Sequence, residues 1–181
     1  MVLQERILTV AEFDDFVRLP DHGDTQFELI DKQVCSKKST IKSSQIAMTL
    51  GILVGAFVRE HGLGYITGAD GGYQVSGQRY IPDVAFVSKA RQAEPSDETY
   101  SSIAPDLAIE VVSPTDSSAN VRIKLTNYLN AGTVVWIVDP SAKTVEVYTP
   151  EKSPKKLSEK DTLSGGDVLP DFAVIVKEIF A

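Results

Sequence analysis

The sequence is poor in the residues that build disulfide frameworks and zinc centres. Among 181 residues there is one cysteine, Cys35, and there are two histidines, His22 and His61, which lie far apart in the chain. A single cysteine excludes an intramolecular disulfide and a cysteine-based zinc cluster. We expect Cys35 to be a packed free thiol rather than a nucleophile, and we expect neither histidine to belong to a histidine-rich metal site.

Long hydrophobic runs are also missing. No stretch approaches the roughly 18 unbroken apolar residues that a membrane span needs. Residues 1–10 lack the basic start, apolar middle and cleavage site of a secretory signal. We therefore expect a cytoplasmic protein that does not enter a membrane. The 43% of hydrophobic residues suffices to bury a core, and the length predicts a single domain over residues 1–181.

Positive charge is scarce as well. The formal net charge is −7 and the isoelectric point is near 4.8. Such a charge argues against broad electrostatic attraction to nucleic acid, because Lys and Arg contacts with phosphates dominate that binding. Any surface that binds nucleic acid must then be a local basic patch. The candidates for this patch are Arg79, Arg122, Lys124 and the basic turn at 152–156.

Apolar periodicity and turn residues predict alternating helices and strands. A helix is expected over 10–19, capped by Thr9 with Glu12 three residues later, and the longest helix over 43–61. The strands in the middle of the chain are expected to form a meander, and residues 88–104 a loop that borders the site. The predicted strands are 26–30 and 33–35, joined by a two-residue hairpin turn, then 65–67, 72–75, 83–87, 107–112, 134–138 and 144–148.

Two of these strands form a unit with the helix between them. Residues 107–112 and 134–138 are nearly continuous apolar runs, which is typical of strands buried on both faces. The helix over 120–131 connects them, so the sequence predicts a βαβ unit. A final apolar segment is expected over 174–180.

Two acidic residues interrupt this apolar pattern. Asp83 stands just before a buried strand, and Glu110 lies inside the next one. Burial of an ionised carboxylate needs a cation, hydrogen bonds or chemistry to offset its cost. A divalent cation such as Mg²⁺ takes one or two carboxylates together with waters and phosphate oxygens. Lys124 and Tyr128 share one helix face, from which the ammonium could position or deprotonate a water and offset charge on a phosphate oxygen.

Each of these residues also has a structural interpretation. Asp83 could cap the turn before its strand. Glu110 could form an ion pair with Arg79 or Arg122. Lys124 could be a solvated residue whose stem covers apolar surface.

Short motifs follow one another along nearly the whole chain. They are FELID at 27–31, PD at 82–83, IEVVSP at 109–114, Lys124 and Tyr128 before AG at 131–132, VWIVDP at 135–140 and LPDF at 169–172. In this order they resemble the Uma-type branch of the PD-(D/E)XK nuclease superfamily. The resemblance implies an α/β fold with a restriction-endonuclease-like core, a mixed central sheet flanked by helices, and an added N-terminal helix and hairpin.

The resemblance also implies an activity, namely Mg²⁺-dependent hydrolysis of DNA phosphodiester bonds, with Mn²⁺ as a possible substitute. It assigns metal binding to Asp83, Glu110 and Val111. The superfamily's plain form has a lysine two residues after the glutamate, where this chain has Val112. The Uma-type branch places the lysine on the following helix, so the catalytic lysine would be Lys124.

Glu28 matches an acidic position of the same pattern, where it would bind metal or orient a water, or else pair with a lysine on a neighbouring strand. Two other functions remain open. One is a catalytically inactive scaffold or nucleic-acid-binding module with the same fold, which the acidic net charge favours. The other is a phosphoesterase that acts on a different substrate. We expect a homodimer, paired through an exposed edge strand at 144–148 or through the first hairpin, because two sites would cut two strands.

Overall fold

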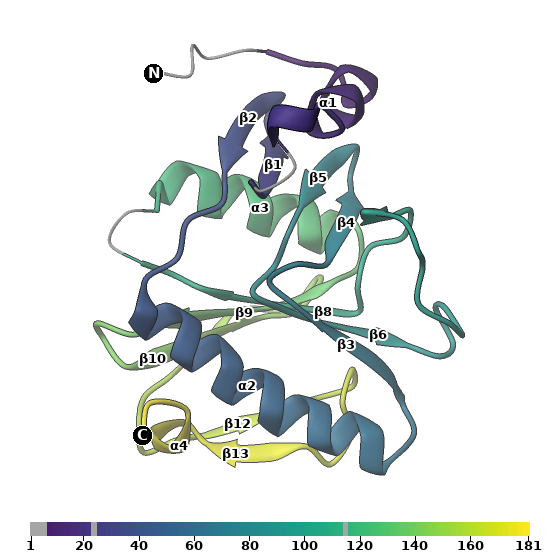
Figure 1. Cartoon of the computed structure of the whole chain (residues 1–181). Helices are drawn as coiled ribbons and strands as arrows, with labels where there is room; N and C mark the ends of the chain where they lie inside the picture. The colour runs from purple at the N-terminus through teal and green to yellow at the C-terminus, as the bar shows by residue number, and fades with distance from the viewer. Residues whose placement is uncertain (1–6, 23–24, 114–115) are drawn as a thin grey trace.

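The computed structural model describes residues 7–22, 25–113 and 116–181. Residues 1–6 and Pro114 of the 109–114 motif lie outside the described residues. The described chain forms a mixed α/β fold, as the sequence predicts, with one large sheet, one smaller sheet and a two-stranded ribbon (Figure 1). The helices and the short 3₁₀ turn are α1 (Val10–Val17), η1 (Pro20–His22), α2 (Ile41–Glu60), α3 (Ser118–Asn130) and α4 (Val176–Ile179).

The central sheet has six strands in the order β11-β10-β9-β8-β6-β3. Strands β8 and β9 are parallel and adjacent, and α3 connects them, which confirms the predicted βαβ unit. The other neighbours in this sheet are antiparallel. The strands are β3 (Gly64–Gly68), β6 (Val84–Ser88), β8 (Leu107–Val111), β9 (Val134–Asp139), β10 (Thr144–Tyr148) and β11 (Lys155–Leu157).

The two faces of the central sheet pack against different helices. Alternation along β8 sends Leu107, Ile109 and Val111 into a core that contains the buried residues of α2. Ala108 belongs instead to a second core, together with Tyr128 of α3. Figure 1 shows α2 and α3 on opposite sides of the sheet. Since Glu110 lies two residues after Ala108, its side chain is directed to the α3 side.

Helix α2 is the longest helix and lies across the sheet. Ile46, Leu50 and Val54 are buried against the central strands, as expected of a core helix. With 20 residues and a mean hydropathy of 1.5, this helix is also long and apolar enough to cross a membrane. It is the one helix among the described residues that meets this criterion. Its outer face exposes Met48 and Ile52.

The smaller sheet lies on the α3 side and has the order β2-β1-β5-β4-β7. Its first hairpin has the predicted register, and the turn residues Asp31 and Lys32 both have positive φ, 49° and 64°. That conformation is typical of a type I′ turn between strands. Helix α1 has the predicted capping box between Thr9 and Glu12, although it ends at Val17 rather than at residue 19. The strands are β1 (Phe27–Ile30), β2 (Gln33–Ser36), β4 (Gly72–Val75), β5 (Gln78–Tyr80) and β7 (Tyr100–Ser101).

Two predictions about the strands were wrong. The middle of the chain is not a meander, because β3 pairs with β6 while β4 and β5 belong to the smaller sheet. The turn at 152–156 runs into β11, which pairs with β10 and removes the expected free edge at 144–148. The final apolar segment, for which the sequence predicted no particular secondary structure, contributes to β13 (Ala173–Ile175), which pairs with β12 (Thr162–Ser164), and to α4.

The close pairing of β3 with β6 depends on a glycine. A Cβ atom on Gly64 would lie 2.0 Å from the Val87 carbonyl oxygen, whereas a Cβ atom on Gly68 would meet nothing within 4 Å. We expect Gly64→Ala to lower the free energy of unfolding by about 1–3 kcal/mol, because the backbones of both strands must move apart. The matched variant Gly68→Ala should change it by less than about 0.5 kcal/mol. Urea denaturation checks this, and equal effects of the two variants would contradict it.

Candidate active site

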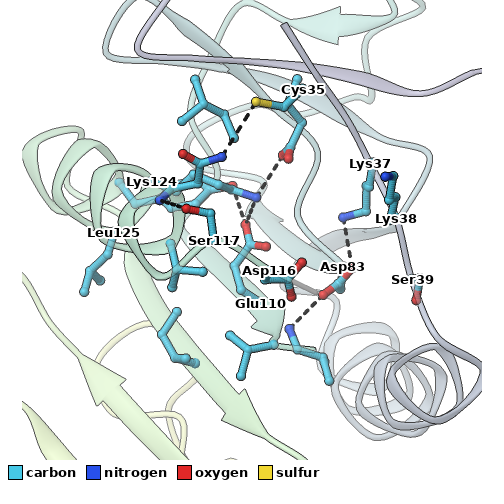
Figure 2. Close-up of a pocket in the computed structure, with 18 of the residues that line it drawn as sticks. Cys35, Lys37, Lys38, Ser39, Asp83, Glu110, Asp116, Ser117, Lys124 and Leu125 are labelled. Carbon is cyan, nitrogen blue, oxygen red and sulfur yellow. Dashed lines mark hydrogen bonds and ion pairs between the residues drawn. The ribbon is translucent and has the colours of Figure 1, made fainter. Parts of the chain in front are cut away.

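The residues that the sequence singles out line one pocket. Its volume is about 240 Å³. Its walls come from the strands β1, β2, β8 and β9, from helix α3 and from the segment that follows β2. Figure 2 shows Asp83, Glu110 and Lys124 in this pocket, and Glu28 and Val111 line it too. The structure therefore brings together all five predicted site residues. The loop at 88–104 was expected to border the site, but none of its residues lines the pocket.

Asp83 and Glu110 are neighbours across two antiparallel strands. Val84 of β6 is opposite Ile109 of β8, and the Asp83 N–H donates to the Ile109 carbonyl at 3.1 Å. Asp83 directly precedes this pair on the β6 side and Glu110 directly follows it on β8, and both carboxylates line the pocket. The Val111 N–H donates to Asp83 Oδ2 at 2.7 Å and holds that carboxylate beside β8.

Lys124 forms ion pairs with both Glu110 and Glu28. Its Nζ lies 2.7 Å from Glu110 Oε1 and 2.8 Å from Glu28 Oε1. The side chains of Lys124, Glu28 and Glu110 are only 9%, 8% and 13% exposed. One helical turn after Lys124, the Tyr128 hydroxyl donates to Glu110 Oε1 at 3.1 Å, and the Ile81 N–H donates to Glu28 Oε1 at 2.8 Å. The shared helix face predicted for Lys124 and Tyr128 therefore points at the acidic residues.

Burial raises the pKa of Glu110 to about 6, and the ammonium groups of Lys124 and Lys37 oppose this shift. Nearby Glu28 and Asp83 raise the pKa of Glu110 further. For Lys124, burial lowers the pKa, but the attraction and hydrogen bonds of Glu110 and Glu28 outweigh it and leave the pKa above its ordinary value. Lys124 is therefore an ammonium group in this arrangement, which suits electrostatic stabilisation better than deprotonation of a water.

A family model described as Uma2, putative restriction endonuclease, matches residues 13–177. The chain belongs to the Uma2 family. The sequence-based resemblance to this branch of nucleases is thereby confirmed.

A solved structure supports the fold of this Uma2 protein. It is the crystal structure of a putative nuclease belonging to DUF820 from Anabaena variabilis ATCC 29413. The two chains are 21% identical and superpose with a TM-score of 0.82 over 96% of this chain and 97% of that one. Among proteins with curated descriptions, none matches significantly.

The structure overturns several structural interpretations of the site residues. Arg79 pairs with Asp14 at 2.8 Å, and Arg122 bonds to Ser118, so the alternative of an ion pair between Glu110 and either arginine was wrong. Lys124 is buried rather than solvated. The partner of Glu28 is a lysine, as one alternative proposed, but this lysine comes from α3 and not from a neighbouring strand.

Cys35 lies in the pocket wall near the acidic residues. Its side chain is partly buried, and the Asn120 amide donates to its Sγ at 3.7 Å. Burial and the charge of Glu28 raise the pKa of the Cys35 thiol. A protonated thiol is a poor nucleophile, which agrees with the prediction of a packed free cysteine.

Sequence reasoning missed Lys37. This residue follows β2, and its Nζ lies 2.9 Å from Asp83 Oδ1 and donates to the Ile81 carbonyl. The only signal was a pair of lysines, Lys37 and Lys38, directly after the strand that pairs with the one carrying Glu28.

The basic patch proposed from the sequence does not form as predicted. Arg79 and Lys124 are buried, with relative exposures of 8% and 7%. At the 152–156 turn, Lys152 pairs with Asp167 and Lys156 with Glu146.

The oxygen ligands of the pocket are compatible with a small divalent cation. Asp83 and Glu110 offer two neighbouring carboxylates, and Val111 can contribute only its backbone carbonyl, since its side chain is buried in the α2-side core. In the part of the chain that the structure describes, no group of three or more His, Cys, Asp or Glu side chains is placed to hold a metal ion by itself. Mg²⁺ does not require one, because it usually keeps several waters and takes oxygens from the substrate phosphate.

The raised pKa of Glu110, about 6 against an ordinary 4.5, predicts a pH-dependent stability. The carboxyl group of Glu110 binds its proton more tightly in the folded protein than in the unfolded chain. Above pH 6 the carboxylate is ionised in both states, and its burial lowers the stability of the fold by the full amount. As the pH falls from 6 to 4.5, the carboxyl group becomes protonated in the folded protein and this loss of stability disappears. In EDTA at pH 7.5 we expect Glu110→Gln to stabilise the protein by on the order of 1–2 kcal/mol. The gain should shrink toward pH 5. Thermal melts of both proteins at the two pH values measure it, and a lower melting temperature for the variant at pH 7.5 would contradict this account.

Proposed function

We propose that this Uma2 protein is a Mg²⁺-dependent endonuclease that hydrolyses DNA phosphodiester bonds. The observation that carries the proposal is that Asp83, next to the start of β6, and Glu110, in the paired strand β8, line one pocket with Lys124 in contact with Glu110. Membership in a family described as putative restriction endonucleases supports it. Mn²⁺ would replace Mg²⁺, because it accepts the same oxygen ligands.

In this proposal Asp83, Glu110 and the Val111 carbonyl hold the cation. The cation, when bound, supplies Lewis-acid activation of the phosphoryl group and of a water nucleophile. The Val111 N–H binds Asp83 Oδ2 at 2.7 Å, so that Oδ1, which Lys37 contacts at 2.9 Å, would be the oxygen offered to the cation. Tyr128 keeps Glu110 in its rotamer through a 3.1 Å hydrogen bond.

Lys124 acts as a fixed positive charge near the scissile phosphate. Its ammonium is held in place by two carboxylates from different sheets, so it needs no reorganisation when negative charge develops on a phosphate oxygen. Glu28 keeps the ammonium in position and is itself fixed by the Ile81 N–H. Glu28 is thus a positioning residue for Lys124.

The acidic net charge of −7 is the observation that favours an inactive scaffold. The pocket lining, however, includes Lys37 and the exposed Lys38 beside the acidic residues, so it is not uniformly acidic. A phosphoesterase acting on a smaller substrate would use the same residues, and a screen of phosphomonoesters and phosphodiesters separates it from a nuclease.

Plasmid cleavage tests the proposal directly. We expect the wild-type protein to nick supercoiled plasmid in Mg²⁺ or Mn²⁺ and to be inactive in EDTA. Glu110→Gln and Asp83→Asn should each lower the rate by at least about a hundredfold, since each removes a metal ligand. Glu60→Gln, the same change at an exposed position of α2, should leave the rate unchanged. Folded wild-type protein that does not cleave any DNA with either metal would support the scaffold instead.

We also propose that the protein is a homodimer, because paired sites cut both strands of a duplex. Since β11 covers β10, the remaining candidate surface is the β1–β2 hairpin, where β2 ends the smaller sheet. Equilibrium sedimentation should give about twice the chain mass of 19.7 kDa. A charged substitution at the β2 residue Val34, which is half-buried, should shift the mass toward the monomer. A monomeric wild-type protein at micromolar concentration would reject this part of the proposal.

A further inference from the structure

Lys37 is a buried cation that the proposed catalytic roles leave unused. Its backbone N–H donates to the Gln26 carbonyl at 2.9 Å, which extends the β1–β2 hairpin by one residue toward the pocket. Its side chain is only 10% exposed, and that of Asp83 is 13% exposed. An ammonium group on a flexible stem is seldom buried to this extent unless it has a fixed partner. Figure 2 shows Lys37 directed at Asp83, whereas Lys38 is directed away from it.

The ammonium of Lys37 lies where a metal ligand would be needed. Asp83 Oδ2 accepts the Val111 N–H at 2.7 Å, and Asp83 Oδ1 accepts the Lys37 ammonium at 2.9 Å. Both oxygens of Asp83 thus have partners, and the partner of Oδ1 is a positive charge. A divalent cation that takes Oδ1 must therefore displace Lys37 or share the oxygen with it at the cost of strong repulsion.

We propose that Lys37 occupies the cation position beside Asp83 in the metal-free protein and exchanges it for a nucleic-acid phosphate when a divalent cation binds. The proposal rests on the metal-dependent nuclease function proposed above. Three carboxylates, from Glu28, Asp83 and Glu110, face two ammonium groups, from Lys37 and Lys124, in this pocket. A bound divalent cation would make this cluster net positive. The displaced ammonium then needs another anion, and a phosphodiester at the pocket mouth provides one.

This exchange couples the binding of metal and of substrate. While Asp83 holds Lys37, the ammonium is withdrawn from the pocket mouth and contributes little to the binding of a phosphate. Once the cation takes Asp83, Lys37 is released on the same side as Lys38 and adds one phosphate contact. Metal binding should therefore strengthen DNA binding through Lys37, and DNA should strengthen metal binding by the same factor.

The first test measures metal affinity without DNA. Isothermal titration of Mn²⁺ into the full-length protein should give an affinity about tenfold higher for Lys37→Met and Lys37→Gln than for wild type, because a competing cation is removed. Lys37→Arg keeps the charge and should bind Mn²⁺ as wild type does. Lys38→Met is the matched control at the exposed neighbouring position and should also have no effect. Damage to the pocket would weaken metal binding, so a gain in affinity identifies competition.

The second test measures DNA binding by fluorescence anisotropy with a labelled duplex, in Ca²⁺ and in EDTA. Lys37→Met should weaken binding several-fold in Ca²⁺, with a salt dependence reduced by about one phosphate contact, and should change binding little in EDTA. Lys38→Met should have the same effect in both buffers. Equal losses for Lys37→Met with and without Ca²⁺ would overturn the exchange.

The outcomes separate this inference from the proposed function. If wild type binds Mn²⁺ and Glu110→Gln does not, but Lys37→Met leaves the affinity unchanged or lowers it, the metal site stands and the exchange is wrong. If neither the wild type nor any Lys37 variant binds Mn²⁺, the proposed metal-dependent function fails and the exchange fails with it. The glutamine variant at position 37 keeps a hydrogen-bond donor for the Ile81 carbonyl, so the test remains decisive if the methionine variant unfolds.

Discussion

The structure depends on one buried ammonium group between two carboxylates. Lys124 contacts Glu110 at 2.7 Å and Glu28 at 2.8 Å, and each of the three residues belongs to a different element. Glu28 lies in the smaller sheet, Glu110 in the central sheet and Lys124 on the helix between them. Burial of such charges is costly without partners, and loss of Lys124, which would leave two carboxylates buried without their shared cation, should cost about 3–5 kcal/mol. The cluster therefore fixes how the two sheets and α3 pack together.

The same electrostatic constraint shapes the chemistry of the pocket. Burial keeps the pKa of Glu110 near 6 even though the Lys124 ammonium contacts it, so this ion pair offsets only part of the cost of burying the Glu110 charge. Two cations, Lys37 and Lys124, contact the two carboxylates proposed as metal ligands. In the proposed exchange of cations, the affinity for metal, the protonation of Glu110 and the binding of phosphate would be linked properties of this one cluster.

Local patterns account for what the sequence predicted. Glu110 stood out because a single carboxylate interrupts an apolar strand, and Lys124 and Tyr128 are four residues apart on one helix. The turn at 31–32 was identifiable from its length alone. The strand β11 was missed because its residues Lys155, Lys156 and Leu157 show no apolar alternation, although it forms a hairpin with β10. The other failures depend on contacts between distant segments: the middle strands are divided between two sheets, and Lys37 meets Asp83 across 46 positions of sequence.

The most direct test of the account is a crystal structure of the protein soaked with Mn²⁺, with data collected at a wavelength where manganese scatters anomalously. The account predicts one anomalous peak within ligand distance, roughly 2.0–2.3 Å, of both Asp83 and Glu110 carboxylate oxygens. Lys37 should have moved away from Asp83 Oδ1 in the same crystal. A fully soaked crystal with no peak between these two carboxylates, and with Lys37 still bound to Asp83, would contradict the account.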